Sequence, residues 1–326
     1  MIVFDMDGVL IDVSKSYRHA VRETAKLFFQ EARRREDLPD PLFSLSDLAT
    51  VQQSGGLNND WDLTCFIIDL LFDLVRPLKI STHPDPWLRY QETVRCCEAE
   101  GLARFLKSSK RPLSMLLEKK KKPDNDFILS LYTNDVGSGN IIKQIFQEIY
   151  LGNDLFRSIY GLAPAVFHGK GLIGLEEPLI NRPDLQWLAK NNLLAIATGR
   201  PRIEAEHPLN HFGMKENFSA IYTLDDCLRE EKRILHDQGL KVCLSKPDPY
   251  MLDAIAARER DSVSDCYYIG DMPDDMEAAV RSTNGFVGLG FLGSAPDKDA
   301  LKTGLLRSGA QHIIKDVKEL KRFFDQ

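Results

Sequence analysis

The chain has 326 residues, which at about 150 residues per domain predicts two domains with a substantial core. Hydrophobic residues make up 43% and charged residues 28%, which excludes a disordered chain and a small disulfide-stabilised one. Lys and Arg number 42 against 48 Asp and Glu, so the formal charge of -6 provides no basic surface for sequence-independent binding to nucleic acid. We therefore expect no nucleic-acid partner.

The sequence also argues against export and membrane insertion. Residues 1–8 contain two carboxylates, whereas a secretory signal starts with basic residues and continues with an apolar segment. The most apolar run, residues 66–75, is interrupted by Asp69 and Asp73, whereas a membrane span needs about 20 apolar residues. The six cysteines form no CxxC pair, which favours reduced thiols. We expect a soluble, cytoplasmic protein with no membrane partner, and the sequence does not indicate its oligomeric state.

The first part of the chain combines one strand with a series of helices. Residues 2–4 are a short β-prone run followed at once by the polar segment 5–8, which is typical of a buried strand that ends in a loop. Apolar residues at helical spacing then predict a helix over about residues 16–35. Further helices, separated by proline-containing connections, are expected at 66–74, 90–106 and 141–150.

After residue 180 short apolar runs alternate with helical segments. Strands are expected at 193–197, 220–223, 266–269 and 286–289. Helices are expected at 184–190, 203–212, 248–258 and 274–281. This alternation predicts βαβ units and a parallel sheet that also includes residues 2–4. We therefore predict an α/β fold with a Rossmann-like parallel sheet, formed by residues 1–11 and 177–326, and a mainly helical domain inserted after the first strand, residues 12–176.

Polar residues cluster where these strands end, and a lysine precedes one of the helices. In chain order they are Asp5, Asp7, Thr198, Gly199, Arg200, Lys246, Asp271, Asp274 and Asp275. Because ligands bind at the carboxyl ends of the strands in open α/β sheets, we expect these residues to converge at one edge of the sheet. Carboxylates this close require a cation, and oxygen ligands indicate a hard divalent ion, Mg²⁺. A carboxylate nucleophile beside Mg²⁺, with a lysine and a hydroxyl to hold an anion, indicates phosphoryl transfer through an acyl-phosphate.

Four short motifs resemble those of the haloacid dehalogenase superfamily and occur in that family's order. They are Asp5-x-Asp7-Gly8-Val9-Leu10, Thr198-Gly199-Arg200, Lys246-Pro247 and Gly270-Asp271-x-x-x-Asp275. The resemblance implies that Asp5 is the nucleophile and Asp7 the general acid/base. It further implies that Asp5, the backbone carbonyl of Asp7, and Asp271 bind Mg²⁺, while Asp275 or Asp274 acts on the metal's water ligands or on Lys246.

The same resemblance implies where the substrate binds. Thr198 and Lys246 would hold the phosphoryl group, and Lys246 would also balance the charge of Asp5. We place Gly199 in the same substrate-binding turn. Arg200, at the end of its strand, is expected either to contact a substrate oxyanion or to be a solvated loop residue.

Several reactions occur within this superfamily, and the motifs discriminate among them. Dehalogenating members lack an aspartate at the second position of the first motif, so Asp7 argues against that reaction. Membrane cation pumps carry an Asp-Lys-Thr-Gly-Thr signature instead. The insertion resembles the helical cap of subfamily IA phosphatases similar to phosphoglycolate phosphatase, although at about 165 residues it is larger. The resemblance implies an Mg²⁺-dependent phosphatase acting on a small phosphorylated metabolite. The alternatives are a phosphomutase or phosphotransferase with the same chemistry, and a non-catalytic binding protein.

Two segments of the insertion have an unusual composition. Residues 55–61 read Gly-Gly-Leu-Asn-Asn-Asp-Trp. They indicate either a loop anchored by a buried tryptophan or a substrate-facing loop in which Asn58 and Asn59 select polar groups. The basic run 119–122 is interpreted as a solvated or mobile linker, with a substrate-attracting patch as the alternative.

Overall fold

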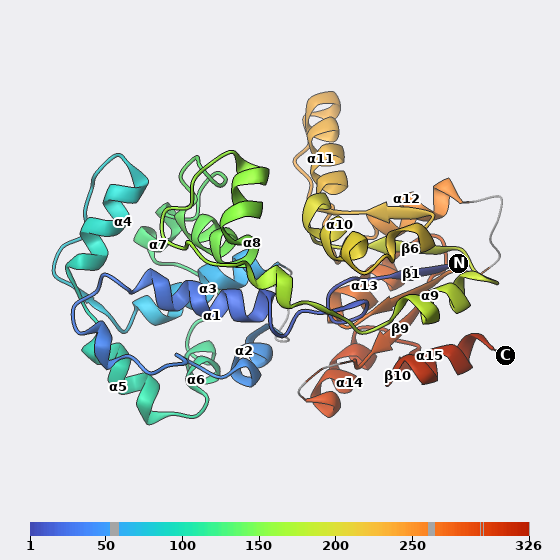
Figure 1. Ribbon diagram of the computed structural model, residues 1–326, viewed down its shortest axis with the longest axis horizontal. Helices are drawn as coiled ribbons and strands as arrows, with labels where there is room; N and C mark the ends of the chain where they lie inside the picture. The colour runs from blue at the N-terminus through green and yellow to red at the C-terminus, as the bar shows by residue number, and fades with distance from the viewer. Residues whose placement is uncertain (53–58, 260–264, 294, 296, 326) are drawn as a thin grey trace. The chain divides into compact units, whose positions relative to one another are not determined.

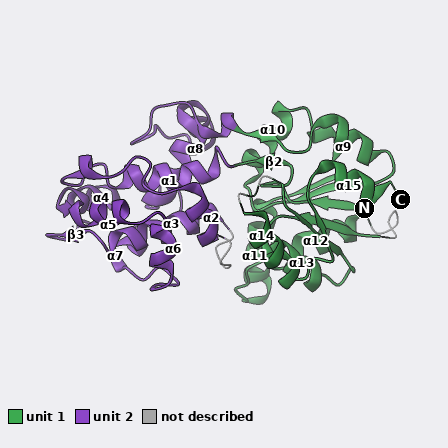
Figure 2. Cartoon of the chain, turned by 90° about the horizontal axis from the view of Figure 1, so that it is seen from below, with its two compact units in different colours: residues 1–13, 176–326 green, residues 14–175 purple. Residues whose placement is uncertain are grey.

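The chain divides into two compact units. The computed structural model describes residues 1–52, 59–259, 265–293, 295 and 297–325. The first unit contains residues 1–13 and 176–326, and the second contains residues 14–175 (Figure 2). The sequence-based boundaries fall after residues 11 and 176.

The first unit is built on a six-stranded sheet in which every neighbouring pair of strands is parallel (Figure 1). The strands lie in the order β10-β9-β8-β1-β6-β7. Their bounds are β1 Ile2–Phe4, β6 Leu194–Ala197, β7 Ala220–Tyr222, β8 Tyr267–Gly270, β9 Val287–Phe291 and β10 His312–Ile314. The predicted parallel α/β sheet is therefore confirmed, with β10 as an additional strand that the sequence analysis did not identify.

The central strand β1 lies at the point where the strand order reverses. Val3 pairs with Ala195 of β6 on one side and with Tyr268 of β8 on the other. Ile2, Val3 and Phe4 are all fully buried although their side chains alternate between the two faces, so both faces of the sheet are covered. The carboxyl ends of β1, β6 and β8 are consequently neighbours, which is where ligands bind in such sheets.

Helices follow the strands of the first unit. Their bounds are α9 Arg182–Ala189, α10 Arg202–His211, α11 Leu224–Gln238, α12 Tyr250–Arg258, α13 Pro273–Arg281, α14 Lys298–Arg307 and α15 Val317–Phe324. The sequence analysis missed α11, α14 and α15. In α11 only Asp226 and Cys227 are buried, so the helix lacks the apolar stripe that the prediction requires. Its sequence signal is instead the capping box formed by Thr223 and Asp226.

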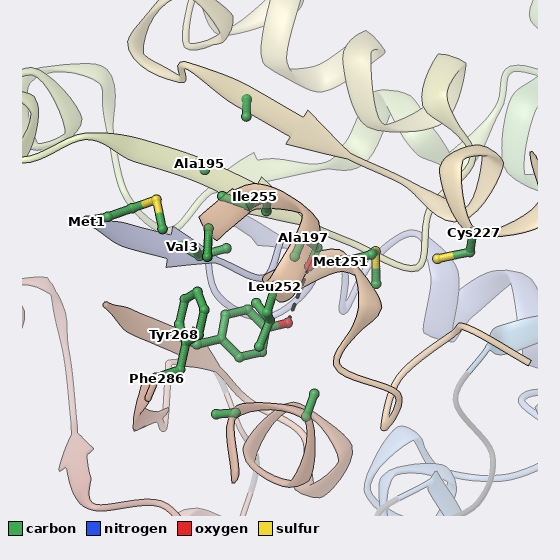
Figure 3. Packing of buried hydrophobic residues seen from close by; sticks show 14 of the residues in the cluster. Met1, Val3, Ala195, Ala197, Cys227, Met251, Leu252, Ile255, Tyr268 and Phe286 are labelled. Carbon is green, nitrogen blue, oxygen red and sulfur yellow. Dashed lines mark hydrogen bonds between the residues drawn. The ribbon is translucent and has the colours of Figure 1, made fainter. Parts of the chain in front are cut away.

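One face of the sheet carries a core in which strand residues meet α12 and α13. Val3, Ala195 and Ala197 of the strands belong to one cluster with residues of both helices, among them Met251, Leu252, Ile255, Ala278 and Ala279 (Figure 3). Tyr268 lies in this cluster, and its hydroxyl oxygen lies 3.3 Å from the carbonyl oxygen of Ala197. Burying each large apolar side chain contributes about 1.5–3 kcal/mol, so this core holds the strand ends in place.

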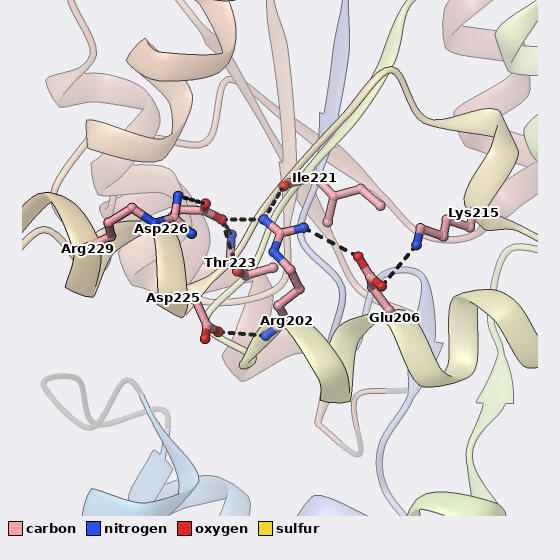
Figure 4. A network of polar contacts seen from close by, with 8 residues as sticks. All are labelled: Arg202, Glu206, Lys215, Ile221, Thr223, Asp225, Asp226 and Arg229. Carbon is pink, nitrogen blue, oxygen red and sulfur yellow. Dashed lines mark hydrogen bonds and ion pairs between the residues drawn. The ribbon is translucent and has the colours of Figure 1, made fainter. Parts of the chain in front are cut away.

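Polar contacts cover the sheet edge at β7. The Arg202 guanidinium donates to the carbonyl oxygen of Ile221 at 3.1 Å and pairs with Asp226 at 2.6 Å (Figure 4). Glu206 pairs with Lys215 at 2.9 Å on the same side. Because an open edge strand is a template for unwanted strand pairing, these charges protect the edge. A cavity of about 670 Å³ lies beside this network, and none of the predicted site residues lines it.

The second unit is mainly helical, as predicted. Its helices are α1 Tyr17–Phe28, α2 Leu45–Gln52, α3 Asp60–Phe72, α4 Pro86–Arg95, α5 Glu100–Ser108, α6 Pro112–Leu117, α7 Asp126–Ser130 and α8 Ile141–Tyr160. Tyr17 of α1 stacks on Tyr150 of α8 with ring centroids 4.1 Å apart. Among the described residues, no helix has the length and apolar character needed to cross a membrane.

Two predicted helices of this unit are shorter or interrupted. The helix expected over 90–106 is divided, because α4 ends at Arg95 and the two-residue strand β4, Cys97–Glu98, pairs with β3, Arg76–Pro77, before α5 begins. The helix expected to reach residue 35 ends at Phe28, and the Arg33 amide then donates to the carbonyl oxygen of Cys97 at 2.9 Å. In both places backbone pairing between distant segments overrides the local helical pattern.

Candidate functional site

The predicted site residues of the first unit converge at the carboxyl end of the sheet. Asp5 follows β1, Thr198 follows β6 and Asp271 follows β8, and these three strands are neighbours. The Asp5 backbone amide donates to the backbone carbonyl oxygen of Ile269 at 2.8 Å, and the Thr198 backbone amide donates to the backbone carbonyl oxygen of Tyr222 at 3.0 Å. The strand ladder therefore fixes the backbone from which both side chains project.

Lys246 connects the nucleophile candidate to the fourth motif. Its Nζ lies 2.6 Å from Asp5 Oδ1 and 2.7 Å from Asp275 Oδ1. The side chains of Lys246, Asp5 and Asp275 are 12%, 8% and 1% exposed. At this degree of burial, solvent screens the Coulombic attraction between the charges less than at the surface, while desolvation of the charges opposes it. One ammonium group thus holds two carboxylates that are 270 positions apart in the chain (275 - 5).

Asp275, rather than Asp274, is the residue that contacts Lys246. Asp275 Oδ1 also accepts a hydrogen bond from the Tyr268 hydroxyl at 2.8 Å, and its Oδ2 accepts from the Met272 amide at 3.0 Å. A Cβ added at Gly270 would lie 2.5 Å from Asp275 Oδ2, so this approach requires glycine. Asp274 Oδ2 is buried without a hydrogen-bond partner among the described residues. Asp275 is therefore the residue that orients Lys246.

Three carboxylates form a cluster that fits a divalent cation. Asp5, Asp271 and Asp275 each present an oxygen, and these atoms all lie within 4.8 Å of one another. Gly8 has φ +74°, and a Cβ there would collide with Asp271 Oδ2, so the loop after β1 packs tightly against Asp271. Oxygen donors in such a cluster suit Mg²⁺. The predicted ligand Asp7 lies in this same loop, between Asp5 and Gly8.

The electrostatics of the cluster show an excess of negative charge. Burial is the main cause that raises the pKa of Asp5 to about 7; Lys246 opposes this shift, and the charges of Asp275 and Asp7 contribute to it. Burial disfavours the charge of Lys246, but Asp275 and Asp5 hold its pKa well above the ordinary value. Burial, with Asp275 beside it, raises the pKa of Asp274 to about 6. A bound cation would favour ionised Asp5 at neutral pH.

The second motif supplies a buried hydroxyl. Thr198 is fully buried, and its Oγ1 accepts a hydrogen bond from the Arg200 amide at 3.2 Å. Gly199 is exposed, and a Cβ added there would meet no atom within 4 Å. Space alone therefore does not require glycine at this position.

Arg200 has an environment that the sequence analysis did not anticipate. It is buried, so the expectation of a solvated loop residue is wrong. Its Nε donates to Asp7 Oδ1 at 2.7 Å, and its two terminal nitrogens donate to the two carboxylate oxygens of Glu176, each at 3.0 Å. Glu176 was not a candidate, because a single glutamate outside any motif carries no sequence signal.

The candidate residues of the second unit have structural partners. Asn58 lies outside the described residues. Asn59 is the N-cap of α3: its side chain accepts from the Asp62 amide at 2.7 Å and donates to Asp62 Oδ2 at 2.5 Å. The Trp61 side chain is buried, and the Lys143 ammonium lies 3.9 Å from its ring centroid. The tryptophan is thus an anchor, and Asn59 stabilises a helix end.

The basic run 119–122 is not a uniformly solvated linker, which corrects the prediction. Lys120 is largely buried and pairs with Asp69 at 2.5 Å, Asp73 at 2.9 Å and Asp124 at 2.5 Å. Asp69 is fully buried and also accepts a hydrogen bond from the Asn125 amide at 2.9 Å. Lys120 therefore neutralises a buried carboxylate, while its neighbours in the run are exposed.

Comparisons with known proteins concern the fold and the family of the chain. A structural-genomics target of unstated activity matches with 21% identity and a TM-score of 0.64, covering 99% of this chain and 98% of the other. A phosphatase from Thermococcus thioreducens matches with 21% identity and a TM-score of 0.51, covering 94% and 98%. No curated protein sequence matches the chain. A family model of haloacid dehalogenase-like hydrolases matches residues 1–283, and the chain therefore belongs to this family.

Proposed function

We propose that the protein is an Mg²⁺-dependent phosphatase that hydrolyses a small phosphorylated metabolite through an aspartyl-phosphate on Asp5. The observation that carries this proposal is the pairing of Lys246 with both Asp5 and Asp275, beside a third carboxylate, Asp271. Such a site attracts a cation and an anionic phosphoryl group together, and it holds a carboxylate nucleophile at their junction.

In the first step a carboxylate oxygen of Asp5 attacks phosphorus. The new bond joins Asp5 to the phosphoryl group, and the bond from phosphorus to the leaving oxygen breaks. Asp7 donates a proton to that oxygen, which leaves as an alcohol. Lys246 and Thr198 bind the phosphoryl oxygens, and Lys246 also keeps Asp5 oriented. Mg²⁺, held by Asp5, Asp271 and the backbone carbonyl of Asp7, would offset the charge of the phosphoryl group.

In the second step water attacks the phosphorus of the aspartyl-phosphate. Asp7, now ionised, accepts a proton from this water, the bond between phosphorus and Asp5 breaks, and inorganic phosphate leaves. Asp5 and Asp7 return to their initial states, so the cycle consumes only water and substrate.

A screen of phosphorylated metabolites tests this proposal. Phosphate release is measured with Mg²⁺ and with a chelator, and kcat/KM is then determined for the best substrates. Asp5→Asn is the inactive control, since a neutral amide is a poor nucleophile. The same reaction is run with a substrate whose phosphoryl group is labelled. Transfer of the labelled phosphoryl group to an added sugar phosphate instead of water would overturn hydrolysis in favour of a phosphomutase or phosphotransferase. Full activity in chelator would refute the role of the metal.

We also infer that the protein works in the cytoplasm. All six cysteines are free thiols in the structure. Cys96 and Cys97 are adjacent, and Cys65, Cys97 and Cys227 are buried as thiols. Free thiols in this number are typical of a reducing compartment. This supports a substrate drawn from small phosphorylated metabolites of the cell interior.

A further inference from the structure

A buried chain of charges leads from Asp7 to the point where the polypeptide returns to the first unit. Arg200 lies between Asp7 and Glu176, and its side chain is 1% exposed, as is that of Glu176, whereas Asp7 is 31% exposed. Besides the Nε contact, a terminal nitrogen of Arg200 lies 2.5 Å from Asp7 Oδ1. Two nitrogens of one guanidinium therefore converge on a single oxygen of the proposed acid/base.

The orientation of the Arg200 guanidinium is fixed from several sides. Glu176 binds both terminal nitrogens, which is the fork geometry that restricts a guanidinium plane. The carbonyl oxygen of Glu204 accepts from a terminal nitrogen at 3.3 Å. The Leu224 amide donates to the backbone carbonyl oxygen of Arg200 at 3.0 Å, and its backbone amide binds Thr198. The Arg200 guanidinium is thus held in a fixed orientation in which it binds Asp7 Oδ1.

Glu176 supplies the charge that makes this burial possible. A buried guanidinium needs paired acceptors, and a partly exposed Asp7 alone would compensate it poorly. Glu176 also begins the returning segment of the first unit. It is followed by β5, Glu177–Pro178, which pairs with β2, Ile11–Asp12. The loop that carries Asp7 and the returning segment are therefore joined twice, by backbone pairing and by Arg200.

We propose that Arg200 and Glu176 are positioning residues that hold the Asp7 carboxyl for proton transfer, an inference that rests on the proposed function. Arg200 acts by binding Asp7, and Glu176 acts by orienting Arg200. Neither residue contacts the substrate, which differs from the oxyanion contact that the sequence suggests for Arg200. Proton transfer depends on donor and acceptor lying within hydrogen-bond reach, so a loosened Asp7 slows only those steps in which a proton moves.

The test separates steps that need a proton from steps that do not. An alkyl phosphate releases a strongly basic oxygen that requires protonation, whereas p-nitrophenyl phosphate releases a phenolate that does not. In Arg200→Lys and Glu176→Gln, kcat for an alkyl phosphate should fall about 10- to 100-fold, part of the ~10²- to 10⁴-fold contribution of general acid/base catalysis. Formation of the phosphoenzyme from p-nitrophenyl phosphate should change less than about threefold, while its hydrolysis slows as much as alkyl phosphate turnover.

Two controls exclude a merely structural effect. Arg202→Lys alters a nearby arginine whose contacts lie with Asp226, Glu206 and Ile221 rather than Asp7, so it should leave the leaving-group dependence unchanged (Figure 4). In an Asp7→Asn background, Arg200→Lys should cause no further loss in phosphoenzyme hydrolysis, because the two changes act through one group. Circular dichroism and thermal unfolding report whether each variant is folded.

The possible failures are distinguishable. Folded Arg200→Lys or Glu176→Gln variants that slow both steps and both substrates equally, or that have no effect, would overturn the positioning role. A loss that adds in full to that of Asp7→Asn would overturn it as well. Absence of any phosphoenzyme in acid-quenched wild-type protein under single-turnover conditions would instead overturn the proposed aspartyl-phosphate mechanism itself.

Discussion

Removing the negative charge of Asp5 is expected to stabilise the metal-free protein at neutral pH. Burial raises the pKa of this carboxyl from 3.8 to about 7 in the folded protein, whereas the unfolded chain restores the ordinary value. An acid whose pKa is higher in the folded state binds its proton more tightly there. Its contribution to stability is therefore present below pH 3.8 and is lost as the pH rises to 7.

The size of the effect follows from the shift. A difference of about 3 pKa units corresponds to ~4 kcal/mol at pH 7 and above, since one unit is worth about 1.4 kcal/mol. At pH 5 the cost is about 2 kcal/mol, because the pH then lies about one unit above the unfolded pKa. The amide of Asp5→Asn carries no such cost. The unfolding free energy of the variant, relative to wild type, should rise by about 2 to 3 kcal/mol between pH 5 and 8.

Urea unfolding with a chelator present, at pH values from 5 to 8, measures this difference. The informative quantity is the change of this free-energy difference with pH, because altered hydrogen bonding to Lys246 adds only a constant offset to the difference. Asp299→Asn removes an exposed carboxylate of the same unit and serves as the matched control for the loss of one negative charge. Added Mg²⁺ should stabilise the wild type more than the Asp5 variant, since the ion binds the folded state. If the difference in unfolding free energy between Asp5→Asn and wild type did not change from pH 5 to 8, the electrostatic account of the site would be refuted.

Four further predictions concern the metal, Lys246, the cap of α3 and Lys120. Chelation should abolish turnover, and added Mg²⁺ should restore it. Lys246→Ala should lower kcat at least 100-fold even with Mg²⁺ present, because Asp5 loses its cationic partner. A near-normal kcat of this variant would contradict the role of Lys246. Asn59→Ala should lower the unfolding free energy by about 1 kcal/mol through loss of the α3 cap, and an unchanged value would show that the cap is dispensable. Lys120→Ala should destabilise the protein by about 3 kcal/mol, because it leaves the buried Asp69 carboxylate without its cationic partner. The control Lys121→Ala, at an exposed lysine, should cost less than about 0.5 kcal/mol. Equal losses in the two variants would assign the effect to overall charge.

The candidate residues Asp5, Thr198 and Asp271 could be identified in the sequence because each follows a short buried strand. Ile2–Phe4 and Leu194–Ala197 are continuous apolar runs, as expected for strands covered on both faces, and polar residues come directly after them. In a parallel sheet such residues meet at one edge whatever the details of packing. The proximity of Asp5 and Asp271 could therefore be expected from residue types and their spacing alone.

Helices and strands without a local apolar pattern were harder to predict from the sequence. α11 is a long helix whose described side chains are mostly exposed and charged, and β10 is only three residues long. The interruption between α4 and α5 depends on pairing with Arg76–Pro77, which lies about 20 positions earlier in the chain. Helical periodicity reports burial along a single segment, so it cannot show where a distant backbone competes for hydrogen bonds.

Residue type and local spacing were enough to predict the fold class, which the structure confirms, and the order of the motifs along the chain. The partners of the buried charges, in contrast, became known only from the folded arrangement. Arg200 meets Glu176 across 24 positions and Asp7 across 193, and Lys120 meets Asp69 across 51 (120 - 69). A charge in a sequence has no preferred partner until folding removes it from water, and then the nearest opposite charge becomes necessary.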